Sequence, residues 1–149
     1  MIYMYRHGEK TKSSNCLSDM GIHRGELIGK IHLADECNVY TVAPAIPYKH
    51  VAPIQTASVA CTVMHKTLHV LSHYTDVPRN HDSRTYVVVW HRGEIPAIMN
   101  YLRLDHDFEW PDDNYTGVVV VFDDGTWLFD PVFMYRPRYE QAAYRNPPP

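Results

Sequence analysis

The chain has 149 residues, of which 45% are hydrophobic and 21% charged, and its formal net charge is -3. This length fits one domain with a single substantial core, and the composition is that of a folded protein and not of a disordered one. No apolar run is long enough to cross a bilayer, and a mildly acidic chain is poorly suited to neutralise nucleic-acid phosphates. We therefore expect neither a membrane nor a nucleic acid among its partners.

The cysteines are three in number, Cys16, Cys37 and Cys61, and none of them forms a close pair in the sequence. This pattern is typical of free thiols in a reducing compartment and not of a disulfide framework. The first residues lack the basic segment and apolar core of a secretory signal. The expected location is therefore the cytoplasm.

The first third of the chain is expected to alternate strands with a helix. A short buried strand covers Ile2–Tyr5, and a second strand covers Asn38–Ala43. Between them, residues 18–34 are predicted to form a helix with Ser18 as its N-cap, a position that serine favours. The apolar face of this helix is expected to contain four residues, Ile22, Leu27, Ile28 and Ile31.

The rest of the chain continues the alternation. A second helix is expected from Ile54 to Leu71. The β-branched run Thr85–His91 is the strongest strand pattern and predicts a central strand covered on both faces. A third helix starts near Glu94. Two further strands, in residues 117–122 and 126–133, are joined by an Asp-Asp-Gly turn, which predicts a terminal hairpin.

This order predicts a three-layer α/β/α fold with a mostly parallel sheet and a C-terminal antiparallel hairpin. Crossover connections should be right-handed. The domain is expected to cover residues 1–144, and the proline-rich residues 145–149 are expected to form an extended tail.

Two of the predicted strands end in histidine, the first at His7 and the later one at His91. Ligands of open α/β sheets bind beyond the carboxyl ends of the parallel strands, so both rings should lie at the same edge. Arg6 and Arg92 stand beside them. Such a group of histidines and arginines predicts a cationic pocket for a phosphoryl group.

Four ordered segments carry a resemblance to a known family: "RHGEK", "LSDMGIHRGELIG", "IQTASVA" and "VVVWHRGEIPAIMNYL". They resemble the motifs of the histidine phosphatase superfamily, the phosphoglycerate-mutase-like enzymes. The short chain is most similar to the minimal branch of small phosphohistidine phosphatases. The residues that match the second and third motifs are Leu17, Gly21, Arg24 and Gly25, and Gln55, Thr56 and Ala57.

The resemblance implies a phosphatase that needs no metal or cofactor. His7 would be the nucleophile and would form a covalent phosphohistidine intermediate. Arg6 and His91 would hold the phosphoryl oxygens, and Asn15 would contribute to substrate binding. The substrate would be a phosphorylated small molecule or a phosphohistidine protein.

The chain departs from the family pattern at Ala52, where the family usually has an arginine that completes the phosphate pocket. Lys49 or His50 could replace this arginine from the neighbouring loop, or Arg92 could do so from the other side. We favour Arg92 because the end of a strand fixes its position. The loss also supports an alternative, a catalytically impaired protein of this fold with a phosphate-binding, structural or assembly role.

The general acid has two candidates, Glu94 beside the second histidine and Asp76 in a turn. Glu9 is expected to orient the pocket and not to transfer protons.

A separate histidine pattern begins in the second predicted helix, where His65 and His69, and His73 just beyond its end, recur every four residues. On a continuous helix these residues would form one stripe that could bind zinc. We favour a solvated helix face, because no second group of ligands accompanies them.

Overall fold

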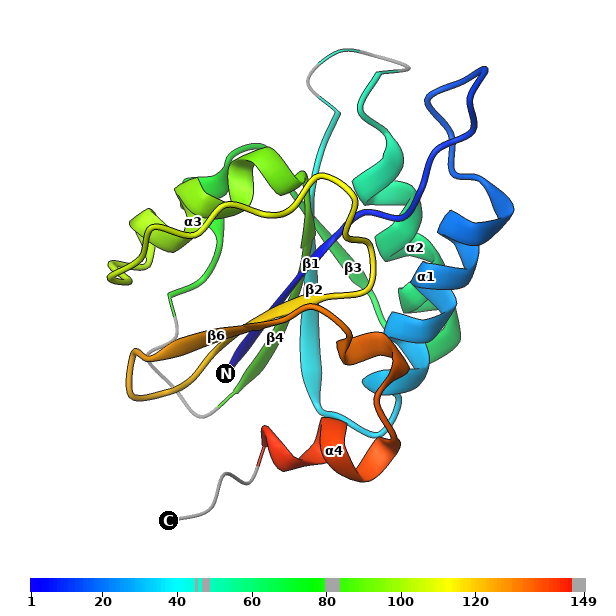
Figure 1. Cartoon of the computed structure of the whole chain (residues 1–149). Helices are drawn as coiled ribbons and strands as arrows, with labels where there is room; N and C mark the ends of the chain where they lie inside the picture. The colour runs from blue at the N-terminus through cyan, green and yellow to red at the C-terminus, as the bar shows by residue number, and fades with distance from the viewer. Residues whose placement is uncertain (45, 47–48, 80–83, 146–149) are drawn as a thin grey trace.

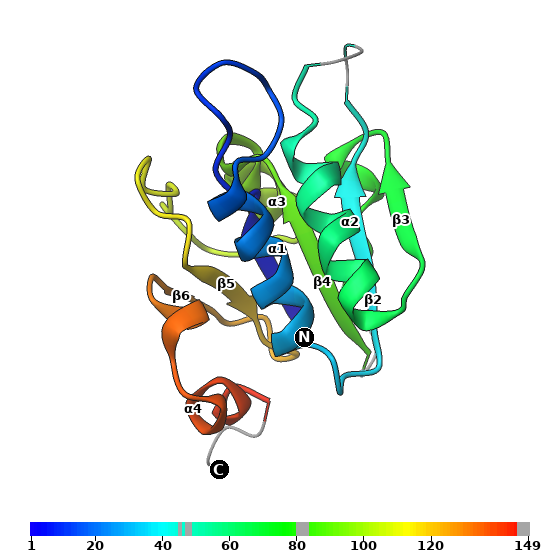
Figure 2. The same ribbon diagram turned by 90° about the vertical axis from the view of Figure 1, so that its right-hand side faces the viewer.

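A computed structural model describes residues 1–44, 46, 49–79 and 84–145 of the chain. Its centre is a six-stranded sheet in the order β3-β2-β4-β1-β5-β6 (Figures 1 and 2). Strands β3, β2, β4 and β1 are parallel, whereas β5 is antiparallel to both β1 and β6. The strands are β1 (Ile2–Arg6), β2 (Cys37–Val42), β3 (Leu68–Leu71), β4 (Thr85–Trp90), β5 (Val118–Val121) and β6 (Trp127–Asp130).

Helices cover both faces of the sheet. Helices α1 (Asp19–Ile31) and α2 (Ala52–Met64) pack on one face, and α3 (Ile95–Tyr101) packs on the other, as Figure 1 shows. The predicted three-layer α/β/α fold with a mostly parallel sheet and a terminal antiparallel hairpin is therefore confirmed. In the described part of the chain, no helix is long and apolar enough to span a bilayer.

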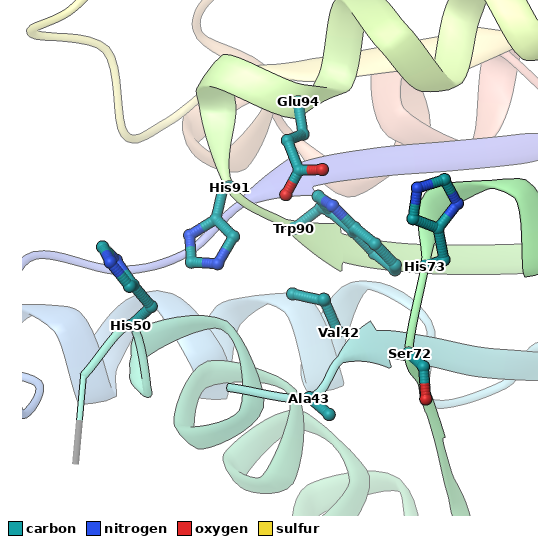
Figure 3. Close-up of a pocket in the computed structure, with 8 residues that line it drawn as sticks. All are labelled: Val42, Ala43, His50, Ser72, His73, Trp90, His91 and Glu94. Carbon is teal, nitrogen blue, oxygen red and sulfur yellow. The ribbon is translucent and has the colours of Figure 1, made fainter. Parts of the chain in front are cut away.

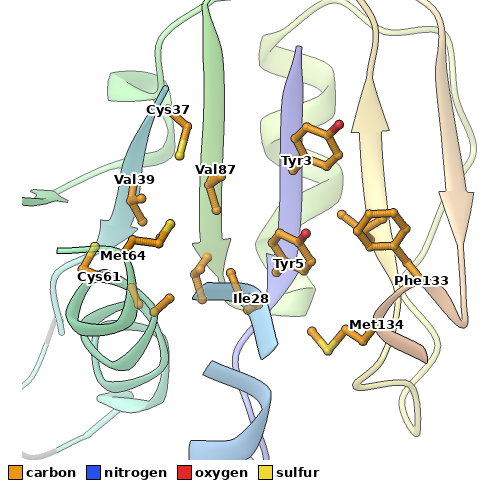
Figure 4. Close-up of a cluster of buried hydrophobic side chains, with 14 of the residues drawn as sticks. Tyr3, Tyr5, Ile28, Cys37, Val39, Cys61, Met64, Val87, Phe133 and Met134 are labelled. Atoms are coloured by element: carbon orange, nitrogen blue, oxygen red, sulfur yellow. The ribbon is translucent and has the colours of Figure 1, made fainter. Parts of the chain in front are cut away.

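The two faces of β1 and β4 bury alternate residues. Tyr3 and Tyr5 of β1 and Val87 of β4 face α1 and α2, where they meet Ile28 and Met64 (Figure 4). Their neighbours in the two strands, among them Ile2, Met4, Val88 and Trp90, pack with α3 on the opposite face. Because side chains of a strand point alternately to the two faces, a strand covered on both sides is apolar throughout.

Helix α1 begins as predicted, since the Ser18 hydroxyl accepts a hydrogen bond from the Gly21 N–H at 3.1 Å. Its buried face consists of Gly21, Arg24, Gly25, Ile28 and Gly29. Ile22 lies outside this stripe and is 38% exposed, so its predicted burial is wrong. The glycines allow α2 to approach closely, and a Cβ atom on Gly29 would lie only 2.6 Å from the Cβ of Val63.

Helix α2 is shorter than predicted. It ends at Met64, and His65 follows in the left-handed conformation with a φ of 55°. The chain then forms β3, which pairs with β2 in a parallel register. His65 is thus a helix cap, His69 belongs to a strand and His73 precedes a 3-10 turn. Both interpretations of the histidine stripe assumed that this helix continues to His73, whereas it ends at Met64. The described residues contain no group of three side chains that could bind a metal ion.

The C-terminal segment forms the predicted hairpin and then a short helix, α4 (Arg138–Ala143), that was not predicted. The turn of the hairpin uses Gly125 at a φ of 85°, a conformation that favours glycine. Arg145, the first residue of the predicted tail, pairs with Asp35 at 2.9 Å. Residues 146–149 of that tail lie outside the described part of the chain.

Candidate active site

The structure brings His7 and His91 together. Strands β1 and β4 are adjacent and parallel, with Arg6 opposite Trp90, so the histidine that follows each strand emerges at the same edge. The His7 backbone N–H donates to the Trp90 carbonyl at 3.2 Å. The two imidazole rings lie 6.0 Å apart between centroids, at an interplanar angle of 75°.

His7 is buried, and its surroundings define which ring nitrogen is free. Nδ1 lies 2.7 Å from the carbonyl oxygen of Gly8, which can only accept a hydrogen bond, so Nδ1 carries the proton. Burial lowers the pKa of the imidazole to about 4, and the nearby basic groups of Arg6, His91 and Lys10 act in the same direction, against the hydrogen bond to Gly8. At neutral pH the ring is therefore uncharged, and its Nε2 has a free lone pair.

The residues of the second and third motifs hold the loop after β1 in place. The Thr56 hydroxyl accepts from the Gly8 N–H at 2.9 Å and donates to the Ala52 carbonyl at 2.8 Å. The Gln55 side-chain oxygen accepts from the Leu17 N–H at 2.9 Å. These residue types are needed because each satisfies a backbone group of the loop that presents His7.

Glu9 and Arg24 form a second support for this loop. The Arg24 guanidinium donates to both carboxylate oxygens of Glu9 at 3.2 Å and to the Tyr135 hydroxyl at 2.6 Å. Glu9 is thus occupied by a structural ion pair, which agrees with a role in orienting the pocket.

Arg6 is buried and directs its terminal nitrogens at the loop before β5. Nη1 donates to the Asp112 and Asn114 carbonyls at 2.6 and 3.2 Å, and Nη2 donates to the Tyr115 hydroxyl at 2.9 Å. The guanidinium carbon also lies 3.8 Å from the centroid of the Tyr115 ring. The buried Nε of Arg6 has no partner among the described residues.

The other predicted site residues divide into two groups. His50 and Glu94 lie at the site: the His50 ring is 5.5 Å from the His91 ring, and both side chains border the cavity described below. Arg92 instead forms an ion pair with Asp112 at 2.9 Å and borders a different cavity, beyond α3.

Lys49, Asn15 and Asp76 are exposed, and none of the three borders the cavity beside His91. The position of Ala52 is buried in the first turn of α2, so the arginine of the family pattern has no counterpart there.

A cavity of about 500 Å³ opens beside His91, at the carboxyl ends of β2, β3 and β4. Figure 3 shows His50 and His91 at one end and His73 at the other, with Glu94 and Trp90 between them. Burial lowers the pKa of His91, although the Glu94 carboxylate opposes this effect. The lining residues are Val42, Ala43, His50, Ser72, His73, Trp90, His91 and Glu94.

Known structures share this architecture. The chain matches a phosphoserine phosphatase from Entamoeba histolytica, solved in complex with 3-phosphoglyceric acid, with a TM-score of 0.52 and 11% identity, over 86% of this chain and 93% of that one. The chain has the histidine-phosphatase fold. The fold that the four motifs predicted is thereby confirmed.

Two further structures match less well. A mycobacterial glucosyl-3-phosphoglycerate phosphatase in complex with VO3 has a TM-score of 0.48 and 13% identity, over 87% of this chain and 96% of that one. A second mycobacterial protein, hydrolase 1, has a TM-score of 0.47 and 14% identity, over 87% and 95%. No family model matches the sequence, and no curated protein does.

Within this histidine-phosphatase fold, sequence reasoning missed three contributors to the site. The positive charge of Lys10 helps to lower the pKa values of both His7 and His91. Tyr115 binds Arg6 from a loop more than a hundred residues away. Trp90 forms a wall of the cavity. Lys10 and Trp90 had a sequence signal, since Lys10 stands three residues after His7 and Trp90 directly precedes His91.

Proposed function

We propose that the protein is a metal-independent phosphatase that hydrolyses a phosphomonoester or a phosphohistidine through a covalent phosphohistidine intermediate on His7. The observation that carries this proposal is the state of the His7 ring. It is buried and uncharged at neutral pH, and Nδ1 is held by the Gly8 carbonyl, so that Nε2 remains as the nucleophile. An imidazole held in this way can attack phosphorus without first losing a proton.

In the first step, the Nε2 lone pair would form a bond to phosphorus while the bond between phosphorus and the leaving group breaks. The departing atom takes the electron pair and receives a proton, for which Glu94 on the cavity wall is the candidate donor. In the second step, water attacks phosphorus and gives a proton back to the Glu94 carboxylate, while the Nε2–phosphorus bond breaks with its electron pair returning to Nε2, and phosphate leaves. His7 regains its lone pair, so the cycle closes.

The phosphoryl oxygens need positive or hydrogen-bonding partners. We assign this role to three groups: the Nε–H of Arg6, the ring of His91, and the ammonium group of Lys10. The Arg6 Nε–H is the strongest of these candidates, because a buried donor without a partner is costly until a ligand accepts from it. His50 extends the group from the far side of His91.

A second candidate function rests on the buried Ala52 and on the engagement of Arg92 with Asp112. Both positions lack a free arginine for phosphate. In this alternative, the protein binds phosphate but turns it over poorly and serves a structural or assembly role.

The deciding experiment is hydrolysis of an aryl phosphate by the wild-type chain and by the variant His7→Gln. We expect turnover that His7→Gln abolishes, whereas the control His23→Ala, at an exposed position of α1, retains it. Quenching at alkaline pH and mass spectrometry should locate the phosphoryl group on the peptide that contains His7. Phosphate binding without turnover in the wild type would instead support the second candidate.

A further inference from the structure

Trp90 has an unusual indole group. The residue is completely buried at the end of β4, and its Nε1–H has no hydrogen-bond partner among the described residues. The chain has three tryptophans, and the other two indole groups are satisfied. Trp110 donates to the Asn114 carbonyl and Trp127 to the Asp105 carbonyl, each at 2.9 Å.

A buried donor without a partner is costly, and such groups in native proteins call for an explanation. Trp90 borders the cavity beside His91, so an acceptor that enters this cavity could satisfy it. The apolar part of the wall comes from Val42 and Ala43 at the end of β2.

The polar part of the same wall offers both donors and acceptors. Ser72, His50 and His73 can each donate a hydrogen bond, and Glu94 is the carboxylate among the lining residues. The volume of about 500 Å³ lies within the range of cavities that hold small organic ligands. The cavity therefore fits a small molecule that carries acceptor oxygens.

We propose that this cavity is the leaving-group subsite of the phosphatase, and that its substrate is a small phosphomonoester whose alcohol portion carries an acceptor oxygen for the Trp90 indole N–H. The inference rests on the proposed function, because His91 connects the two regions. A phosphoryl group held between His7 and His91 would lie next to the cavity that His91 also borders. Trp90 is thus a specificity-determining residue.

This subsite favours a free metabolite over a phosphohistidine on a protein. The indole N–H of Trp90 is below the molecular surface, so its acceptor must enter the cavity. A small molecule can enter the cavity completely, whereas a residue held on the surface of a folded protein brings its backbone against the rim.

The first test observes the donor itself. In a ¹⁵N–¹H spectrum, the three indole resonances are assigned by Trp110→Phe and Trp127→Phe, which leaves the third to Trp90. Adding glycerol 3-phosphate to the His7→Gln variant should move the Trp90 indole proton downfield and leave the other two unchanged. The matched probe n-propyl phosphate, which lacks the hydroxyl groups, should not move it.

A second test measures selectivity. The wild-type chain should prefer glycerol 3-phosphate to n-propyl phosphate by about tenfold in kcat/KM, the value of one good hydrogen bond. Trp90→Phe should bring this ratio close to one, and the control Trp127→Phe should retain it, because that indole binds Asp105 outside the cavity.

The outcomes separate the two proposals. Turnover of an aryl phosphate that depends on His7, combined with no selectivity and no movement of the Trp90 resonance, would overturn the subsite while the proposed function stands. Faster turnover of a phosphohistidine peptide than of glycerol 3-phosphate would overturn the substrate class. A wild-type chain that neither binds nor hydrolyses any of these phosphates would overturn both.

Discussion

The Nδ1 atom of His7 lies 2.7 Å from the carbonyl oxygen of Gly8. This single contact between neighbouring residues fixes the tautomer of the ring and leaves the lone pair of Nε2 free for nucleophilic attack. Gly8 is itself anchored, because its N–H donates to Thr56 in the first turns of α2. The geometry of the nucleophile is therefore set by two layers of the fold, the sheet and the helix above it.

The low pKa of His7 predicts activity in mild acid. Because burial lowers this pKa to about 4, the neutral ring persists well below the ordinary histidine value of about 6.5. The acidic limb of kcat/KM for an aryl phosphate, corrected for ionisation of the substrate, should fall near pH 4. A limb near pH 6.5 would contradict the assignment of a buried neutral nucleophile.

The same shift predicts how stability depends on pH. The folded-state pKa of His7 lies below its unfolded value, so between about pH 6.5 and pH 4 the unfolded chain binds more protons. The contribution of the neutral ring is complete above this window and is lost as the pH falls through it. Urea denaturation should show a shallower loss for His7→Gln than for the wild type.

The difference between the two chains is the quantity to measure, since burial also lowers the pKa values of His32 and His91. Those histidines are present in both chains and contribute equally to their slopes. Identical slopes would show that His7 has no shifted pKa.

Gly8 and Gly21 predict a steric constraint on the active loop. A Cβ atom on Gly8 would overlap the backbone of Gly21, which belongs to α1 and cannot move aside easily. Gly8→Ala should therefore cost about 1–3 kcal/mol of unfolding free energy and lower activity, because it displaces the carbonyl that holds His7. The measurement is urea denaturation together with aryl phosphate turnover.

Gly93→Ala is the matched control, since a Cβ atom at that exposed position has nothing within 4 Å. It should change the unfolding free energy by no more than about 0.5 kcal/mol. Equal losses in the two variants would mean that the approach of Gly8 to α1 is not what limits the loop.

Asp130 predicts how the C-terminal segment is attached. Burial alone would raise the pKa of this carboxyl, but hydrogen bonds from Arg136, Tyr144 and the Val132 backbone outweigh it, and the pKa lies below its ordinary value. Asp130→Asn weakens these bonds and should lower the melting temperature by several degrees. Glu140→Gln, which removes only an exposed partner of Arg136, should lower it much less.

The pH dependence of Asp130 has the opposite window to that of His7. Its stabilisation is complete above the unfolded pKa of about 3.9 and is lost as the pH falls through the lower folded value. Calorimetry near neutral pH is therefore the right measurement, and a difference between wild type and Asp130→Asn that vanished there would exclude the proposed attachment.

The central sheet was predictable because its strands are buried on both faces. The runs around Tyr3 and Val88 are apolar throughout, which identifies them without knowledge of their partners. The edge strand β3 was not predicted, because it is not buried on both faces. His69 and Val70 are exposed, so the segment carries no apolar run and no strict alternation.

The end of α2 could not be predicted from local preferences. His65 adopts a left-handed conformation that glycine or asparagine usually provides, and the chain leaves the helix there because β2 offers a parallel edge for pairing. Helix α4 is likewise held by tertiary contacts, among them the hydrogen bond from the Gln141 side chain to the Phe133 carbonyl.

The two histidines of the site were predictable, because the ends of parallel strands meet at one edge. Their partners were not. Tyr115 reaches Arg6 from a loop in which the Trp110 indole N–H donates to the Asn114 carbonyl, and no periodic pattern in the sequence predicts this path. Arg92 follows His91 directly, yet Asp112 in the same loop binds it and draws it away from the cavity.

Another cation of the site should replace the missing arginine. We expect Lys10 to provide it, because its charge acts on both His7 and His91, whereas Arg92 is held by Asp112. Lys10→Met should lower kcat/KM for an aryl phosphate by at least about tenfold, since a cation aimed at the transferring group stabilises its developing charge. Arg92→Met should lower it less.

Lys12→Met serves as the control, because Lys12 is an exposed lysine of the same loop. It should leave kcat/KM near the wild-type value, which would show that the effect of Lys10 is local and does not reflect the overall charge of the loop. A larger loss in Arg92→Met than in Lys10→Met would reverse the assignment. Arg92 would then have to exchange Asp112 for the phosphoryl group when substrate binds, and Asp112→Asn should in that case raise kcat/KM by freeing it.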